Sequence, residues 1–264
     1  MVQLSRNVMC AIGLCALVAA IGCDRKDKNS PVATSSPSGA STAPSSAAAE
    51  SRDNALIRVV DATPDTAPVD LFADGNKVFD NLNYKKVTPY KEMDGQRYSW
   101  EVKKAGATTD SPALAKNSEG MSDGAYYTVF VLPGDGNDLI DLKVVTDDQK
   151  RPDDGKARIR VVNATRDKAE VDVFAPNTDK ALVGGVNFQT VTGYSEVDPV
   201  SGDLELRKSG EKVPLVKIAN SNIESGKSYT VVLIGAAKGK PKVDAFLIED
   251  QMKAPATAAG PVPR

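Results

Sequence analysis

An internal repeat constrains the fold of this chain more than any other feature. The segment that begins at Ile57 reads Ile-Arg-Val-Val-Asp-Ala-Thr-Pro-Asp-Thr-Ala-Pro-Val-Asp-Leu-Phe-Ala, and the segment that begins at Ile159 is identical to it at twelve of seventeen positions. A shorter match, Tyr-Thr-Val at Tyr127 and Tyr229, keeps the separation of 102 residues, and between these segments Val87-Thr88 matches Val191-Thr192 at a separation of 104 residues. A period near 100 residues is the size of one small domain and is too long for a solenoid repeat. The chain is therefore predicted to hold two copies of one domain.

The composition outside the two copies predicts segments without a packed core. The stretch before copy 1 is rich in Ser, Ala, Pro and Thr, has no aromatic residue, and cannot bury enough apolar surface to offset its ordering entropy. The charged joint between the copies holds Pro152 and Gly155, which break regular structure. The expected organisation is a signal peptide at 1–22, a lipidated Cys with a disordered linker at 23–54, copy 1 at 55–148, copy 2 at 156–251 and a disordered tail at 252–264.

The local patterns inside each copy are those of strands. Tyr98, Trp100 and Val102 alternate with polar residues, which is the period of a half-buried strand. The runs 126–132 and 229–234 are apolar on both faces, which suits central strands. Asp-Gly and Ser-Gly pairs mark turns between the runs, at positions 74–75, 94–95, 123–124 and 201–202. We therefore predict an all-β fold with two tandem antiparallel β-sandwich (Ig-like) domains of seven or eight strands each. The matching tyrosines at 90 and 194, and at 127 and 229, are expected in the cores, with Trp100 as a core residue.

The repeated motif, the later Gly and Tyr-Thr-Val, and the domain length resemble the domain of unknown function family DUF4397. The resemblance covers both copies and implies an extracytoplasmic β-sandwich that often occurs in tandem and is often tethered. It does not imply a reaction. The segment after the first strand usually contains His-Ala-Ser-Pro-Asp in this family. Here the His is replaced by Asp61 and Asn163, and no role of that His can be carried over.

The beginning of the chain resembles a bacterial lipoprotein signal. An apolar run of 15 residues, Val8 to Gly22, is shorter than the roughly 20 residues that span a bilayer and matches a signal-peptide core. It ends in Ala20-Ile21-Gly22-Cys23, which resembles the lipobox and implies that the sulfur of Cys23 carries the lipid that holds the chain to a membrane. A plain secretory signal or an uncleaved anchor are the alternatives. All three cysteines lie at or before position 23, so the mature chain can form no internal disulfide.

The charge and composition of the chain limit the classes of partner that it can bind. Cleavage of the signal leaves a formal charge of −3, which argues against nucleic acid as a partner and against a polybasic membrane patch. The expected location is the cell envelope, lipid-anchored on the extracytoplasmic side of the inner or the outer membrane. Asp24 is a candidate inner-membrane retention signal.

Two pairs of charged residues recur in both copies. Arg58 matches Arg160, and Asp70 matches Asp172. The favoured interpretation is a structural pair within each copy, Arg58 with Asp70 and Arg160 with Asp172, which links strands or anchors a turn. The alternative is a ligand site built twice.

The sequence offers little for metal binding or catalysis. The loop 134–138, with Asp141 nearby, is rich in oxygen ligands, but its spacing does not fit an EF-hand and copy 2 has no acid there, so a polar hairpin is favoured over a calcium site. There is no His, no nucleophile elbow and no phosphate-binding glycine loop. No cofactor, metal site or catalytic residue is predicted.

These features favour a non-enzymatic binding, adhesion or structural module whose partner is an envelope protein or polymer. The second hypothesis is an envelope hydrolase that acts on glycan or peptide through paired carboxylates. A deep pocket that holds two or more ionisable groups would favour the enzyme, and a convex surface with only shallow grooves would favour the module.

Overall fold

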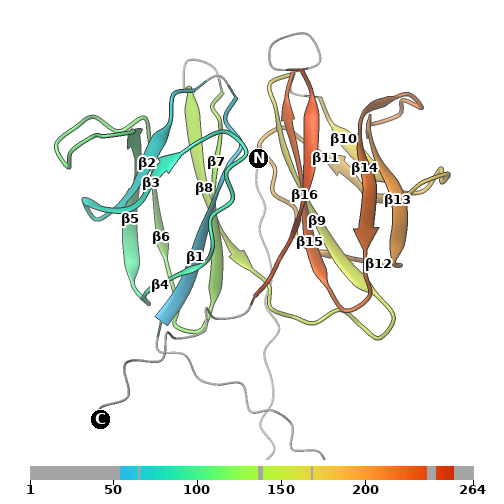
Figure 1. Ribbon diagram of the computed structural model, residues 1–264, viewed down its shortest axis with the longest axis horizontal. Coiled ribbons are helices and arrows are strands. Elements are labelled where there is room, and N and C mark those ends of the chain that lie inside the picture. Colours follow the sequence, from blue (N-terminus) through green and yellow to red (C-terminus); the bar gives the residue numbers. More distant parts are fainter. Residues whose placement is uncertain (1–53, 65, 136–138, 168, 237–241, 253–264) are drawn as a thin grey trace, which may run out of the picture. The chain divides into compact units, whose positions relative to one another are not determined.

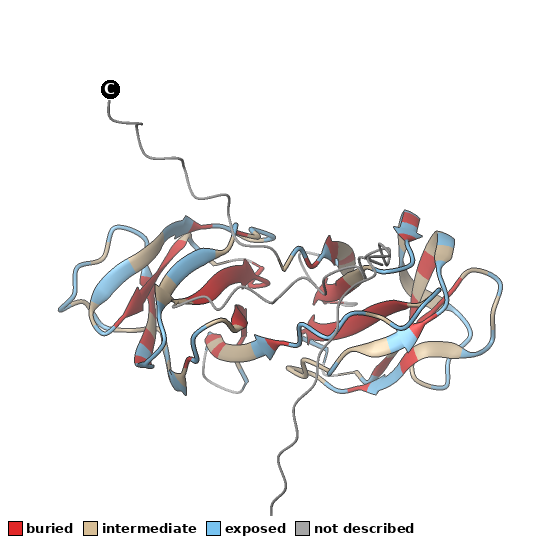
Figure 2. Cartoon of the chain, turned by 90° about the horizontal axis from the view of Figure 1, so that it is seen from below, coloured by how far each residue is buried: buried red, intermediate tan, exposed pale blue. Residues whose placement is uncertain are grey.

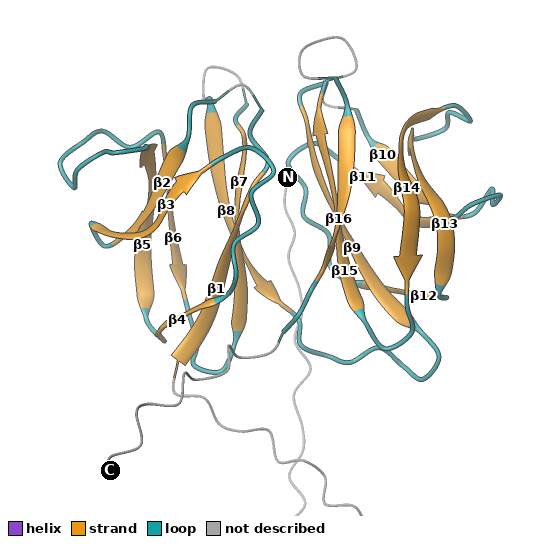
Figure 3. Ribbon diagram, viewed as in Figure 1, coloured by secondary structure: helices purple, strands orange, loops and turns teal. Residues whose placement is uncertain are grey.

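The computed structural model describes residues 54–64, 66–135, 139–167, 169–236 and 242–252, which belong to one compact unit, Ala49–Arg264. The described residues form strands and loops without any helix, as Figure 3 shows. This confirms the predicted all-β sandwich fold. The signal peptide, Cys23, nearly all of the linker and nearly all of the C-terminal tail lie outside the described residues.

Each copy contributes eight strands (Figure 1). The strands of copy 1 are β1 Asn54–Asp61, β2 Val69–Ala73, β3 Asn76–Leu82, β4 Lys91–Asp94, β5 Arg97–Lys104, β6 Ala115–Gly120, β7 Tyr126–Pro133 and β8 Ile140–Asp147. The strands of copy 2 are β9 Ala157–Thr165, β10 Val171–Phe174, β11 Ala181–Val186, β12 Ser195–Val197, β13 Val200–Lys208, β14 Pro214–Ile223, β15 Ser228–Gly235 and β16 Asp244–Glu249.

The strands of each copy form two four-stranded sheets with the same topology in both copies. The sheets of copy 1 have the orders β4-β1-β7-β8 and β3-β2-β5-β6, and those of copy 2 have the orders β12-β9-β15-β16 and β11-β10-β13-β14. The two long apolar runs form β7 and β15, which are central strands as predicted. One pair in each copy, β1 with β7 and β9 with β15, is parallel, whereas the other pairs are antiparallel.

Alternation along the strands builds a separate core inside each sandwich, and Figure 2 shows the buried residues on the strands of both copies. Trp100 and Val102 of β5 are fully buried in copy 1, and Leu204 and Leu206 of β13 hold the matching positions in copy 2. Tyr127 and Tyr229 are buried in these cores, where their hydroxyls accept hydrogen bonds from the backbone nitrogens of Ser122 (2.9 Å) and Glu224 (3.0 Å). The predictions for Trp100, Tyr127 and Tyr229 are confirmed.

A third apolar cluster lies between the two copies. Along β1, Ile57 and Val59 face the core of copy 1, whereas Val60 belongs to this third cluster. The other buried members are Ala62, Phe130, Leu132, Val162, Ala164, Val232, Ile234 and Ile248. Strands β1, β7, β9 and β15 are therefore buried on both faces, because one face packs inside its own sandwich and the other packs against the second copy.

The predicted turns are partly correct. Asp74 and Gly75 connect β2 to β3 with positive φ angles of 49° and 78°, which suits a tight hairpin turn. Ser201 and Gly202, however, lie inside β13, so the prediction of a turn there is wrong. Gly202 has a φ of 120° and a Cβ placed on it would lie 2.9 Å from Pro176, which explains why glycine stands within the strand.

Candidate functional site

The four charged residues that recur in the sequence are not paired as predicted. Arg58 lies on β1 and Asp70 on β2, which belong to different sheets of copy 1, and the same separation holds for Arg160 and Asp172 in copy 2. The predicted pairs Arg58–Asp70 and Arg160–Asp172 are therefore wrong. The physical reason is that both arginines lie on the strand faces that contact the other copy, away from β2 and β10.

The two aspartates serve as turn anchors within their own copies. The carboxylate of Asp70 accepts hydrogen bonds from the backbone nitrogens of Asn81 (2.8 Å) and Gly106 (2.9 Å) and lies 2.6 Å from the Lys77 ammonium. Burial raises the pKa of Asp70, but these donors outweigh it and hold the pKa below its ordinary value. Asp172 likewise accepts from the backbone nitrogen of Gly185 at 2.8 Å.

Arg58 instead joins the two copies. Its Nε donates to the hydroxyl of Thr128 on β7 at 2.9 Å, and its Nη2 pairs with Asp250, which follows the last strand of copy 2. Both side chains of this ion pair are almost completely buried. Asp250 also accepts from the hydroxyls of Thr230 (2.7 Å) and Tyr194 (2.8 Å), so its carboxylate is fully engaged.

Arg160 makes the reciprocal set of contacts. Its Nε donates to Thr230 at 2.7 Å, and its Nη2 lies 2.6 Å from the carboxylate of Asp147 in copy 1. Asp147 also accepts from the hydroxyls of Thr128 (2.7 Å) and Tyr90 (2.8 Å). Each copy thus supplies one Arg, one Thr, one Tyr and one Asp, and each Arg pairs with the Asp of the other copy. We call these eight side chains the intercopy network.

The electrostatics of the intercopy network keep its arginines charged and its tyrosines neutral. Burial lowers the pKa of Arg58, but the charge of Asp250 and its neighbours raises it, so that the net shift is upward. Burial and the nearby carboxylates raise the pKa values of Tyr90 and Tyr194 far above the ordinary range. These two tyrosines are half-buried at the contact between the copies, whereas the sequence predicted them in the cores.

Asp147 and Asp250 were not predicted as functional residues. Asp147 lies at the very end of copy 1, and the separation of Asp147 and Asp250 is 103 residues, whereas the main repeat has a separation of 102. Both residues lie at the end of the last strand of their copy, Asp147 as the final residue of β8 and Asp250 directly after β16, and this shared position is the signal that could have identified them.

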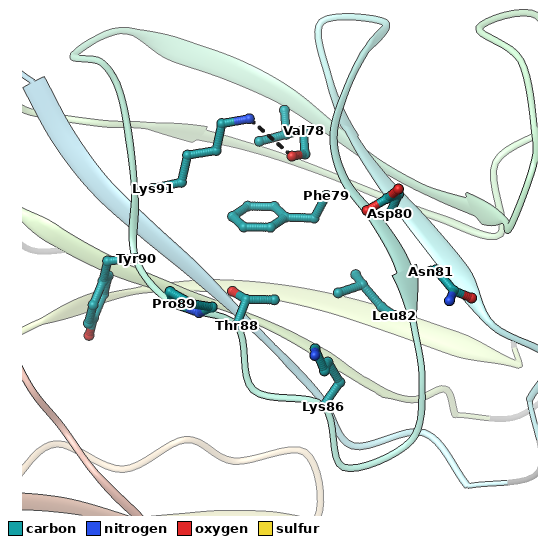
Figure 4. Close-up of a pocket in the computed structure, with 10 residues that line it drawn as sticks. All are labelled: Val78, Phe79, Asp80, Asn81, Leu82, Lys86, Thr88, Pro89, Tyr90 and Lys91. Atoms are coloured by element: carbon teal, nitrogen blue, oxygen red, sulfur yellow. Dashed lines mark hydrogen bonds between the residues drawn. The ribbon is translucent and has the colours of Figure 1, made fainter. Parts of the chain in front are cut away.

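Copy 1 has a surface hollow of about 530 Å³, which we call the copy 1 groove (Figure 4). It lies between the edge strand β3 and the segment that leads into β4. Phe79 lies in the middle of Figure 4, between Lys91 and Leu82, and the Lys91 ammonium donates to the carbonyl of Val78 at 3.2 Å. The lining residues are Val78, Phe79, Asp80, Asn81, Leu82, Lys86, Thr88, Pro89, Tyr90 and Lys91.

A second hollow, of about 1000 Å³, lies between the joint and the ends of β15 and β16. Three acids line it, namely Asp154, Glu249 and Asp250. Asp250 is engaged in the intercopy network, and Glu249 pairs with Lys227 at 3.1 Å. Two of the three acids that line this hollow are therefore already paired with cationic side chains.

The remaining candidate sites fall largely outside the described residues. Cys23 lies outside them, as do residues 136–138 of the acidic loop, and Asp141 accepts a hydrogen bond from the backbone nitrogen of Leu142 at 2.9 Å. Among the residues with a described position, no three His, Cys, Asp or Glu side chains are grouped to hold a metal ion. Within the same residues, no helix is long and apolar enough to cross a membrane.

Comparison with solved structures finds ten matching chains, and two of them illustrate the similarity. The C-terminal domain of AlgF from P. aeruginosa is 20% identical with a TM-score of 0.29, and the match covers 36% of this chain and 99% of that domain. A candidate cell adhesion protein from Bacteroides eggerthii is 10% identical with a TM-score of 0.22, and the match covers 75% of this chain and 95% of that protein. No curated protein matches the chain.

The family model of the domain of unknown function DUF4397 matches the chain twice, at residues 55–174 and 160–261. Together the two matches include every strand except the first residue of β1. The chain therefore belongs to the DUF4397 family and holds two tandem DUF4397 domains.

Proposed function

We propose that this protein is a lipoprotein, anchored through Cys23 on the extracytoplasmic side of a membrane, whose two DUF4397 domains form one non-enzymatic binding module. The export signal and the lipobox-like segment before Cys23 support the anchor. The Ser-rich and Ala-rich linker would hold the module away from the bilayer. The partner would be an envelope protein or polymer.

The observation that carries the binding role is the position of the repeated charged residues. Arg58, Arg160, Asp147 and Asp250 are buried between the copies and satisfied by one another and by hydroxyl groups. The repeated arginines, for which the sequence offered a ligand site built twice as an alternative, thus hold the two domains together. Because the two domains share this buried contact, a ligand would meet one body with two surfaces rather than two independent domains.

The anchor is tested by metabolic labelling with an alkyne fatty acid followed by fractionation of cell envelopes. The wild-type chain should carry the label and sediment with membranes, whereas Cys23→Ala should lose the label. An unlabelled wild-type chain would overturn the anchor. In the same fractionation, Asp24→Ser should change the distribution between the two membranes if Asp24 acts as a retention signal, and an unchanged distribution would reject that role.

The binding role is tested with isolated envelope material and the purified chain. The chain should sediment with the material and release no soluble glycan or peptide fragments. Release of such fragments would support an envelope hydrolase and overturn the non-enzymatic assignment. Failure to sediment would overturn the binding role.

A further inference from the structure

The copy 1 groove differs in its chemistry from the matching surface of copy 2. Three of the lining positions keep the same kind of residue in both copies. They are Leu82, Thr88 and Tyr90 in copy 1, which correspond to Val186, Thr192 and Tyr194 in copy 2. The threonines even keep the same hydrogen bond, because Thr88 accepts from the Val59 nitrogen at 2.9 Å and Thr192 from the Val161 nitrogen at 3.0 Å. The local backbone is therefore shared by the two copies.

The aromatic ring and the two ammonium groups that line the groove are present at these positions in copy 1 alone. Phe79, Lys86 and Lys91 correspond to Val183, Thr190 and Ser195, so copy 2 lacks the aromatic ring and both ammonium groups. The two lysines therefore do not serve the shared fold, whereas Phe79 packs against the core of copy 1 as Val183 packs in that of copy 2 and adds a larger ring. A volume of about 530 Å³ lies within the range of ligand sites.

The charges at the groove favour an anionic ligand. Lys86 and Lys91 are both exposed, and Asp80 is the one acid among the lining residues. The chain as a whole has a formal charge of −2, so its net charge does not attract a polyanion, and the two lysines supply a local attraction at this position. Lysine suits such contacts because its ammonium is a flexible point charge with three donors.

The backbone at the groove disfavours a peptide that extends the sheet. Strand β3 is an edge strand, but the carbonyl of Val78 already accepts from Lys91. The pairing of β2 with β3 has two register shifts, and Asn81 has a φ of 47°, so β3 does not present a regular ladder. A ligand here would be recognised through side chains.

We propose that the copy 1 groove binds acidic sugar residues of an envelope polysaccharide. Lys86 and Lys91 pair with the sugar carboxylates, and Phe79, which is partly buried at the centre of the groove, packs against the apolar C–H face of a sugar ring. This inference rests on the proposed binding role and names the ligand class for it.

The experiment is calorimetric titration of the full-length chain with a galacturonic acid hexamer as the probe. The fully methyl-esterified hexamer is the matched ligand control, because it keeps the sugar rings and removes the charge. Lys86→Gln/Lys91→Gln should weaken binding by about tenfold or more, since a hydrogen bond to a charged group contributes about 1.5 kcal/mol or more. Phe79→Val introduces the residue of copy 2 and should weaken binding by about threefold or more.

Lys212→Gln is the matched protein control, because Lys212 is also exposed but lies in copy 2. It should bind the hexamer as the wild type does, and the lysine variants should keep the wild-type melting temperature. The proposal would be overturned if the wild type bound the esterified hexamer as tightly as the acidic one, or if the wild type did not bind at all. Wild-type affinity in the lysine double variant would also overturn it. Tighter binding of hexaglutamate through the same lysines would replace the sugar with an acidic peptide. Loss of sedimentation with envelope material would instead count against the binding role itself.

Discussion

Asp61 and Asn163 occupy the same position in the two copies but differ in what they can donate. The Oδ1 atom of Asp61 accepts from the backbone nitrogen of Thr63 at 2.8 Å, and that of Asn163 accepts from the nitrogen of Thr165 at 3.1 Å. The amide of Asn163 also donates to the carbonyls of Ala169 (2.8 Å) and Val186 (2.9 Å). An ionised carboxylate has no hydrogen for such contacts, so Asp61 is the less favourable residue at this buried position.

We expect Asp61→Asn to stabilise the protein by about 1–3 kcal/mol near pH 7, because it replaces a buried carboxylate with a group that can donate. Burial raises the pKa of Asp61, and the hydrogen bonds from Thr63 lower it only in part. A raised pKa means that the folded state binds the proton more tightly, so the wild type loses stability as the pH rises from the unfolded to the folded pKa. The gain from Asn should therefore be small near pH 4 and larger near pH 8.

Denaturant unfolding at the two pH values checks this prediction. Asn163→Asp is the mirror substitution and should destabilise the protein near pH 7. A loss of stability in Asp61→Asn near pH 8 would show that the carboxylate is the better residue.

The intercopy network gives a second prediction at the residue scale. Asp147→Ala removes the partner of Arg160 and leaves a buried guanidinium without its counter-ion, which should cost about 3–5 kcal/mol. Asp198→Ala is the control, because its pair with Lys156 is exposed to solvent and should contribute little. Urea unfolding of both variants measures the difference. Equal stability of the two variants would contradict the structural role of the network.

At the scale of single elements, β7 shows why one strand can belong to two cores. Val129 and Val131 face the core of copy 1, whereas Phe130 and Leu132 face copy 2, and all four are fully buried. The matching strand β15 divides its residues in the same way. The apolar character of both faces was visible in the sequence, but the identity of the covering surface was not.

Phe130→Ala tests this double role. The substitution leaves the core of copy 1 untouched, yet we expect it to cost about 3–5 kcal/mol because the ring is lost from a packed interface. The measurement is the shift in the urea midpoint. Leu139→Ala, which truncates an exposed apolar residue, is the control. If Phe130→Ala lowered the free energy of unfolding by less than Leu139→Ala does, the outer face of β7 would be exposed to solvent.

The elements were predictable where a local pattern determines them. Alternation identified the strand around Trp100, and the doubly apolar runs identified β7 and β15. Asp74 and Gly75 were predicted from turn chemistry alone. The prediction of a turn at Ser201–Gly202 was wrong. Gly202 lies inside β13, where the absence of a side chain lets Pro176 approach closely.

The arginine partners were not predictable in the same way. Arg58 and Asp250 are separated by 192 residues, and no local pattern encodes such a contact. The sequence therefore singled out the two arginines of the intercopy network but not the aspartates with which they pair.

At the scale of the whole described unit, the buried contact between the copies should make them unfold together. Trp100 is the only tryptophan and lies in copy 1, so its fluorescence reports on that copy. Leu206→Ala creates a cavity in the core of copy 2 and should cost about 2–5 kcal/mol. If the copies are coupled, the Trp100 transition shifts by the same amount as the circular dichroism transition.

An unchanged Trp100 midpoint, with a circular dichroism curve that splits into two steps, would show that the copies unfold independently. Val102→Ala in copy 1 is the matched control, because Val102 is fully buried in the same way and should shift both signals in either case.

The reciprocal contact between the copies also has a consequence for how such a gene can diversify. In a symmetric homodimer each mutation appears on both subunits, so a new surface group is always made twice. Joining the halves in one chain removes that restriction. Lys86 and Lys91 stand in one half while Thr190 and Ser195 stand in the other, although both halves keep the same Arg, Thr, Tyr and Asp at their contact. A tandem gene of this kind can acquire new surface chemistry in one half while the other preserves the shared architecture.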